Sequence, residues 1–159
     1  MGANQKSRIR TLCSVLLWND GPKRSLSSMI ANVVSFNIKS PLIVVPVTIK
    51  TQTGIRDCKF AVDTGSSFTM IDLGVMENIG YSRVTDSIGT VRTVTASKSE
   101  TAYEFCLNNI MALGLIRRNF KVISRSLPLG LGIDGLLGLN FFKHKELKIN
   151  FKLGEISIE

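Results

Sequence analysis

The sequence predicts a mainly β protein with one or two short helices, and three observations predict this class. Of 159 residues, 44% are hydrophobic and 20% are charged, with a mean hydropathy of +0.19, which is enough apolar side chain for a globular core. The apolar segments are short and rich in β-branched residues, as strands are. Clusters of Gly, Asn, Asp and Pro separate these segments at short intervals, as turns do.

Eight segments have the length and composition of strands. In chain order they are Leu42–Ile49, Asp57–Val62, Phe68–Ile71, Thr90–Thr95, Thr101–Leu107, Phe120–Ser124, Lys148–Lys152 and Glu155–Ile158. Pro46 lies within the first of them and predicts a sheet edge or a bulge, because proline cannot donate a ladder hydrogen bond. Gln52-Thr53-Gly54 predicts the turn into the second strand.

The helix signals are weaker. Asp72 is expected to cap a short helix over Leu73–Ile79, which Gly80 would end. A glycine-rich loop, Leu129–Gly135, precedes a single helical turn over Leu139–Phe142. The glycines of this loop lack the Lys-Ser/Thr of a phosphate-binding loop, so the sequence does not predict nucleotide chemistry there.

Residues 1–35 are expected to be a basic extension to one domain that spans 36–159. Asn19-Asp20-Gly21-Pro22 and Ser25–Ser28 have the composition of a linker. Residues 1–40 hold six Lys or Arg against Asp20 alone, so they supply +5 of the net charge of +8. A basic end of this kind is more often a solvated tail than a contact for nucleic acid or membrane, and the aromatic residues that would stack on bases are nearly absent. A basic adaptor that binds such a partner is the lesser alternative.

Cys13, Cys58 and Cys106 form an odd and widely spaced set. They match neither a zinc-ligand spacing nor a disulfide framework, so we expect reduced thiols, no metal and no cofactor. The apolar stretch Leu12–Trp18 is too short and too polar for a secretory leader. A cytoplasmic location is therefore expected.

The most informative segment for chemistry is Asp63-Thr64-Gly65-Ser66-Ser67, which lies inside an apolar run. A carboxylate among residues that favour burial must be paired or hydrogen-bonded, since an isolated buried charge is very costly. Glycine permits a sharp turn, and the hydroxyl residues can donate to a carboxylate. The segment predicts a carboxylate at the tip of a tight loop between two buried strands, although an ordinary turn would suit the same residues.

Together with Asp134-Gly135-Leu136-Leu137-Gly138-Leu139-Asn140-Phe141-Phe142, this segment resembles the retropepsin-like aspartic peptidases, most closely their cellular, prokaryote-type members with one lobe per chain. The resemblance covers about residues 40–159. It implies a closed or partly open β-barrel-like acid-protease lobe, in which Leu136-Leu137-Gly138 braces the catalytic loop and a hairpin over Arg92–Phe105 forms the flap. Flap tips of this family usually contain glycine, whereas Ala96–Ser99 has none, and an Asp is common where this chain has Asn140.

The resemblance implies an aspartic endopeptidase that cleaves polypeptides with a water activated by two carboxylates. The implied catalytic residues are Asp63, Thr64 and Gly65, and the implied substrate-binding residues are Ser66, Ala96, Ser97, Leu136, Leu137 and Gly138. Thr64 would hydrogen-bond across a two-fold axis, and Ser66 would donate to the outer oxygen of the Asp63 carboxylate.

The chain contains one Asp-Thr-Gly, so the second carboxylate must have another source. Asp134 lacks the following Thr/Ser-Gly and is expected to be structural, and His144 lies in a basic, surface-like run. A symmetric homodimer would place Asp63 opposite its own copy. The alternative from a different class is a catalytically inactive dimerisation or peptide-binding module on the same fold.

Overall fold

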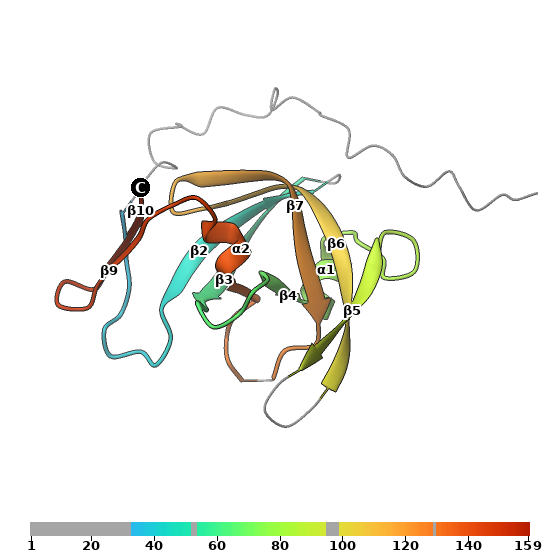
Figure 1. Cartoon of the computed structure of the whole chain (residues 1–159), viewed down its shortest axis with the longest axis horizontal. Helices are drawn as coiled ribbons and strands as arrows, with labels where there is room; N and C mark the ends of the chain where they lie inside the picture. Colours follow the sequence, from blue (N-terminus) through green and yellow to red (C-terminus); the bar gives the residue numbers. More distant parts are fainter. Residues whose placement is uncertain (1–32, 52–53, 95–98, 129) are drawn as a thin grey trace, which may run out of the picture.

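The computed structural model describes residues 33–51, 54–94, 99–128 and 130–159 (Figure 1). Most of the predicted extension lies outside these residues, as do Ala96 and Ser97 at the predicted flap tip. The described strands are β1 Val33–Ser35, β2 Val44–Lys50, β3 Ile55–Val62, β4 Met70–Asp72, β5 Gly89–Val94, β6 Ser99–Ala112, β7 Leu115–Arg125, β8 Gly135–Leu137, β9 Leu147–Asn150 and β10 Glu155–Ile158. The described helices are α1 Leu73–Asn78 and α2 Leu139–Phe142.

Six of the strands close into a barrel. Their order is β2-β3-β8-β4-β7-β6, and pairing of β2 with β6 closes the ring while β5 adds to β6 from outside. Figure 1 shows the β5–β6 hairpin projecting from one side of this barrel. The prediction of a mainly β, barrel-like lobe with two short helices is confirmed.

A second, three-stranded sheet of order β1-β10-β9 lies beside the barrel, on the side away from the β5–β6 hairpin (Figure 1). Val34 pairs with Ile156, and Ile156 and Ile158 are buried in the main core. Val33–Ser35 therefore belong to a sheet of the domain, although the sequence placed them in the extension. Among the described residues, no helix is long and apolar enough to cross a bilayer.

The pattern of β2 explains how a proline fits into this barrel. Val45, Val47 and Ile49 are buried on one face, as the period of two predicts. Pro46 precedes the stretch Val47–Lys50 that pairs with β6, so only β3 lies beside it. Pro46 therefore lies at a sheet edge, although the Val47–Lys50 half of the same strand is paired on both sides.

The longest elements are β6 and β7, which the sequence predicted too short. They form one hairpin through Leu113 and Gly114, both with positive φ, at 50° and 73°. Polar residues in the middle of this hairpin, such as Asn109 opposite Arg118, interrupt the apolar pattern. The strands predicted from that pattern are therefore shorter than those of the structure.

The core has a main cluster inside the barrel and a smaller cluster at one end of it. Phe60, Phe105 and Phe141 are among the largest fully buried side chains of the main cluster. The smaller cluster consists of Met70, Ala102 and Ile123, with Val91, Leu127 and Leu136 packed against them.

Candidate active site

The Asp63 loop, residues 63–69, leaves the barrel between two strands that do not pair with each other. β3 enters the loop and β4 leaves it, while β8 lies between them, parallel to β3 and antiparallel to β4. Gly135 lets β8 fit between β3 and β4, because a Cβ there would lie 2.5 Å from the Met70 carbonyl oxygen and 2.6 Å from the Phe60 ring. The loop is thus held at the end of a three-strand unit.

Asp63 begins this loop with a half-buried side chain. Its backbone N–H donates to the Leu137 carbonyl at 3.0 Å, and Gly65 N–H donates to its carboxylate Oδ1 at 3.0 Å. Thr64 and Gly65 are exposed. A carboxylate on a tight loop between two buried strands, as predicted, is therefore present.

The other residues predicted to bind substrate lie around this loop in different ways. Ser66 Oγ donates to the Phe68 carbonyl at 2.8 Å, and not to the Asp63 carboxylate as the resemblance implied. Leu136 is half-buried in the smaller cluster, whereas the Leu137 side chain is fully buried in the main core. Leu137 therefore accepts the Asp63 N–H bond through its carbonyl, while its side chain belongs to the main core.

The start of α2 braces the loop from behind. Leu139 N–H donates to the Ser66 carbonyl at 2.8 Å, and Asn140 N–H donates to the Ser67 carbonyl at 3.2 Å. A Cβ at Gly138 would lie 2.4 Å from the Phe68 carbonyl carbon and oxygen, so the two backbones are in direct contact.

Asn140 and Thr69 form a partly buried polar connection that sequence reasoning did not identify. Asn140 Oδ1 accepts from Thr69 N–H at 2.7 Å and from Thr69 Oγ1 at 2.8 Å, while its Nδ2 donates to the Lys121 carbonyl at 2.9 Å. An ionised Asp would accept the first two bonds but could not donate the third. Asn140 therefore uses both its amide oxygen, as an acceptor, and its amide nitrogen, as a donor.

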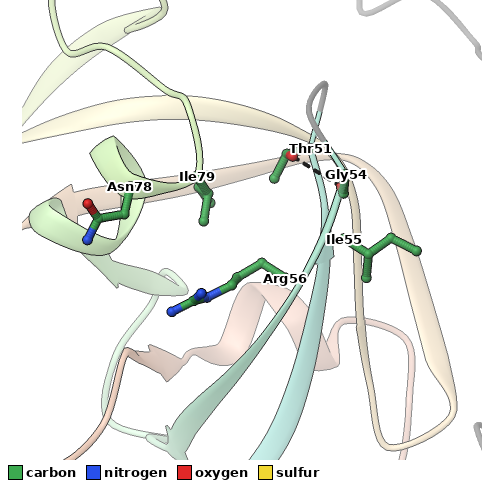
Figure 2. A pocket seen from close by; sticks show the side chains of 6 residues that line it. All are labelled: Thr51, Gly54, Ile55, Arg56, Asn78 and Ile79. Atoms are coloured by element: carbon green, nitrogen blue, oxygen red, sulfur yellow. Dashed lines mark hydrogen bonds between the residues drawn. The ribbon is translucent and has the colours of Figure 1, made fainter.

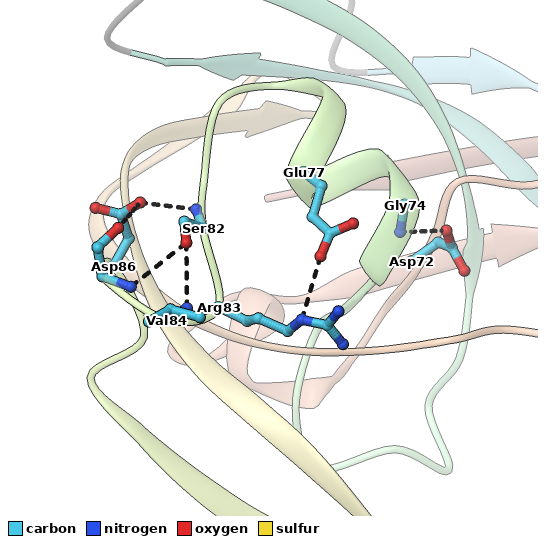
Figure 3. A network of polar contacts seen from close by, with 8 residues as sticks. Asp72, Gly74, Glu77, Ser82, Arg83, Val84 and Asp86 are labelled. Carbon is cyan, nitrogen blue, oxygen red and sulfur yellow. Dashed lines mark hydrogen bonds and ion pairs between the residues drawn. The ribbon is translucent and has the colours of Figure 1, made fainter.

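Asp72 is engaged in holding α1 and the loop before β8. Its Oδ1 accepts from Gly74 N–H at 2.9 Å and from Val75 N–H at 3.4 Å, which confirms the predicted helix cap. Its Oδ2 accepts from Leu127 N–H at 2.9 Å. Figure 3 shows this cap beside the Glu77–Arg83 ion pair and the turn closed by Asp86.

The Asp134 and Asp57 carboxylates also accept hydrogen bonds from neighbouring strands. Asp134 Oδ2 accepts from Lys59 N–H at 2.8 Å, and Asp134 N–H donates back to the Lys59 carbonyl at 2.8 Å. Asp57 accepts from Thr48 Oγ1 at 2.9 Å across the β2–β3 pair. The expectation that Asp134 is structural agrees with these bonds.

Cys58 is the buried thiol of β3. Burial first, and then the negative charge of Asp134, raises its pKa to about 11. The thiol is therefore protonated at neutral pH, whereas a nucleophilic cysteine needs a thiolate. His144 is exposed on the turn after α2, as predicted.

The predicted flap corresponds to the hairpin of β5 and β6, whose tip lies outside the described residues. An ion pair joins this hairpin to the barrel: Arg125 Nη1 at the end of β7 lies 2.5 Å from Glu100 Oε2 on β6. The pair connects the hairpin to the segment that leads into the glycine-rich loop.

A small open pocket lies at the far end of β3 from Asp63 (Figure 2). It is lined by Thr51, Gly54, Ile55, Arg56, Asn78 and Ile79. Because β3 rises about 3.3 Å per residue, the pocket lies roughly 20 Å along the strand from the Asp63 loop. It is therefore separate from the candidate active site.

Comparisons with known proteins agree with this geometry. The aspartyl protease family model matches residues 45–141. A retropepsin-like aspartic protease from Rickettsia conorii superposes with a TM-score of 0.56 at 18% identity, covering 79% of this chain and 87% of that one. The retroviral protease-like domain of Ddi1 from Leishmania major superposes with a TM-score of 0.53 at 20% identity, covering 76% and 90%. A search among curated protein sequences found no match.

The family match spans more than half of the chain and includes both the Asp63 loop and the β8–α2 brace. The chain therefore belongs to the aspartyl protease family, and its fold is that of a retropepsin-like lobe.

Proposed function

We propose that this protein is an aspartic endopeptidase whose active site forms between two copies of the chain, with one Asp63 from each copy. The observation that carries the proposal is the state of the Asp63 carboxylate. It is half-buried at the end of β3, and Gly65 N–H is its one hydrogen-bond donor within the described residues. The exposed Thr64 and Gly65 beside it are accessible to a second copy.

Two such carboxylates at close range would share one proton, since like charges there cannot both ionise. The ionised carboxylate accepts a proton from water, whose oxygen then attacks the scissile carbonyl carbon, while the protonated carboxyl donates to the carbonyl oxygen. The tetrahedral intermediate collapses when the carboxyl that took the proton from water donates it to the leaving nitrogen, the other carboxylate takes a proton from a hydroxyl of the intermediate, and the C–N bond breaks. No covalent bond to the protein forms.

The substrate in this proposal is an extended polypeptide between the Asp63 loop and the flap hairpin. An extended chain can add to a strand edge through backbone hydrogen bonds, and β5 is the outermost strand of its sheet. Leu136, in the smaller cluster at the loop end of the barrel, would contact substrate side chains, and Ala96 and Ser97 would cover them.

The deciding test is incubation of the purified full chain with a denatured protein substrate at roughly pH 4 to 7. Asp63→Asn should abolish cleavage, because an Asn cannot share the proton. Asp57→Asn is the matched control: it makes the same change of charge at an exposed residue of β3 and should retain activity. Cleavage that persists in Asp63→Asn would refute the proposal.

The same experiment separates the alternative function. A peptide-binding or dimerisation module would bind substrate peptide without turnover at every pH tested. That alternative draws on the absence of glycine from Ala96–Ser99, which would restrict a flap that must open and close.

A further inference from the structure

Two exposed apolar side chains lie at the Asp63 loop, one within it and one on the segment that braces it. Phe68 is 42% exposed and Leu139 is 47% exposed. They come from backbone segments in direct contact, because Leu139 N–H bonds to the Ser66 carbonyl and Gly138 packs on the Phe68 carbonyl. An exposed pair of large apolar groups next to a catalytic loop is suited to an apolar residue of a ligand.

Four exposed cations lie on β7 and on the turn after α2, which are the two segments next to Asn140. These residues, which we call the cationic rim, are Arg118, Lys121, Lys143 and Lys145. Hydrogen bonds hold the two segments of the rim together. Asn140 Nδ2 donates to the Lys121 carbonyl at 2.9 Å, and Arg117 Nη2 donates to the Lys143 carbonyl at 2.5 Å.

Within the described residues the rim cations form no ion pair with the carboxylates nearest to them in sequence and register, which are Glu146 after Lys145 and Glu104 on β6. None of the four rim cations takes part in an ion pair there, and the residues opposite Lys121 and Arg118 on β6 are Cys106 and Asn109. An anion that binds beside unpaired cations gains electrostatic free energy from those near it.

The direction of Lys121 connects the rim to the candidate active site. Lys121 and Ile123 project from the same face of β7, since alternate residues of a strand share a face. Ile123 packs with Met70 and Leu136 in the smaller cluster, and these residues come from the strands around the Asp63 loop. The Lys121 side chain therefore leaves β7 on the side of the loop.

We propose that Phe68, Leu139 and the cationic rim form an outer substrate subsite, which selects polypeptides carrying an apolar residue followed by acidic residues away from the scissile bond. The proposal rests on the proposed peptidase function, since it names the substrate class of that same site. A polypeptide is favoured over nucleic acid because the exposed apolar pair suits an apolar side chain, and the aromatic residues next to the rim are buried and cannot stack on bases: Phe120, Phe141 and Phe142.

The test compares two fluorescent peptides that share a central apolar segment and differ only in one flank, either three glutamates or three glutamines. Their binding to the full-length Asp63→Asn protein is measured by anisotropy, which requires no cleavage. The glutamate peptide should bind about tenfold more tightly at low salt, and the difference should shrink to about twofold at high salt. In the wild-type enzyme the same preference should appear in KM.

Charge reversal at the rim provides the matched comparison. Lys121→Glu should remove the preference for the glutamate peptide and create one for a peptide with three lysines. Lys152→Glu makes the same change of net charge on the exposed turn between β9 and β10 and should leave the preference intact.

Equal binding of the glutamate and glutamine peptides would overturn the subsite, as would a preference that survives Lys121→Glu. Tighter binding of a single-stranded RNA oligonucleotide than of the glutamate peptide would assign the rim to nucleic acid and also overturn it. Failure of the wild type to cleave would count against the peptidase proposal alone, because the binding measurements remain readable without turnover.

Discussion

At the scale of single residues, the position of Asp63 depends on small side chains that let other backbones approach it. Gly135 and Gly138 have ordinary φ angles, so their role is space and not conformational freedom. At Gly138 the neighbour is backbone, which cannot rotate aside as a side chain can. The loop should therefore be sensitive to a single added methyl group.

Gly138→Ala is expected to lower the free energy of unfolding by about 3 kcal/mol, because its Cβ would overlap the Phe68 carbonyl and Thr69 N–H. Urea unfolding of the purified variant measures this. Gly74→Ala serves as control, since its Cβ would meet only the Asp72 side chain at 3.2 Å, and its effect should stay within about 1 kcal/mol. A wild-type stability for Gly138→Ala would show that the loop relaxes away from α2.

Much of this local chemistry could be predicted from the sequence. Asp63, its loop and the Asp72 cap were found because each combines a short motif with flanking apolar periodicity. Asn140 and Thr69 were not found, because their three hydrogen bonds join residues about seventy positions or nineteen positions apart. Such long-range pairs leave no local pattern.

At the scale of elements, the strand lengths predicted from the sequence differ most from the structure in the β6–β7 hairpin. Its turn residue Leu113 has a positive φ, which leucine rarely adopts, but its side chain is 4% exposed and packs in the core. Burial of that side chain offsets the backbone strain. A turn of this kind lacks the Asn-Gly or Asp-Gly signal on which sequence prediction relies.

Within the described residues, one ion pair joins the flap hairpin to β7 in addition to the backbone pairing of β6 with β7. Glu100→Gln should raise amide hydrogen exchange in β5 and the start of β6, because Arg125 would lose its charged partner. Global stability should fall by no more than about 1 kcal/mol, since Glu100 is partly exposed. Exchange measured by mass spectrometry reports both effects.

The control for this variant is Glu77→Gln on α1, which makes the same change of charge in the exposed ion pair between Glu77 and Arg83 (Figure 3). It should leave exchange in β5 and β6 unchanged. Unaltered exchange in Glu100→Gln would mean that backbone pairing between β6 and β7 is sufficient to hold the base of the hairpin.

At the scale of the whole molecule, the lobe places one candidate catalytic carboxylate on a loop at its surface. The other aspartates discussed above hold backbone or side-chain donors of their own lobe. The proposed chemistry needs a second carboxylate, which the homodimer proposal takes from another chain. The net charge of +8 per chain opposes that association at low ionic strength, because two copies repel each other.

Mixing wild-type protein with Asp63→Asn tests this requirement directly. If chains exchange freely and a site needs two intact Asp63 residues, activity follows the square of the wild-type fraction, so an equal mixture retains about one quarter of the activity. If each chain carries a complete site, the equal mixture retains about one half. The mixture should be equilibrated at about 0.15 M salt, where charges are screened beyond about 8 Å, so that repulsion does not limit pairing. A linear dependence at a protein concentration where sedimentation detects dimers would rule out a shared dyad. A quadratic one would require that both copies contribute to each catalytic event.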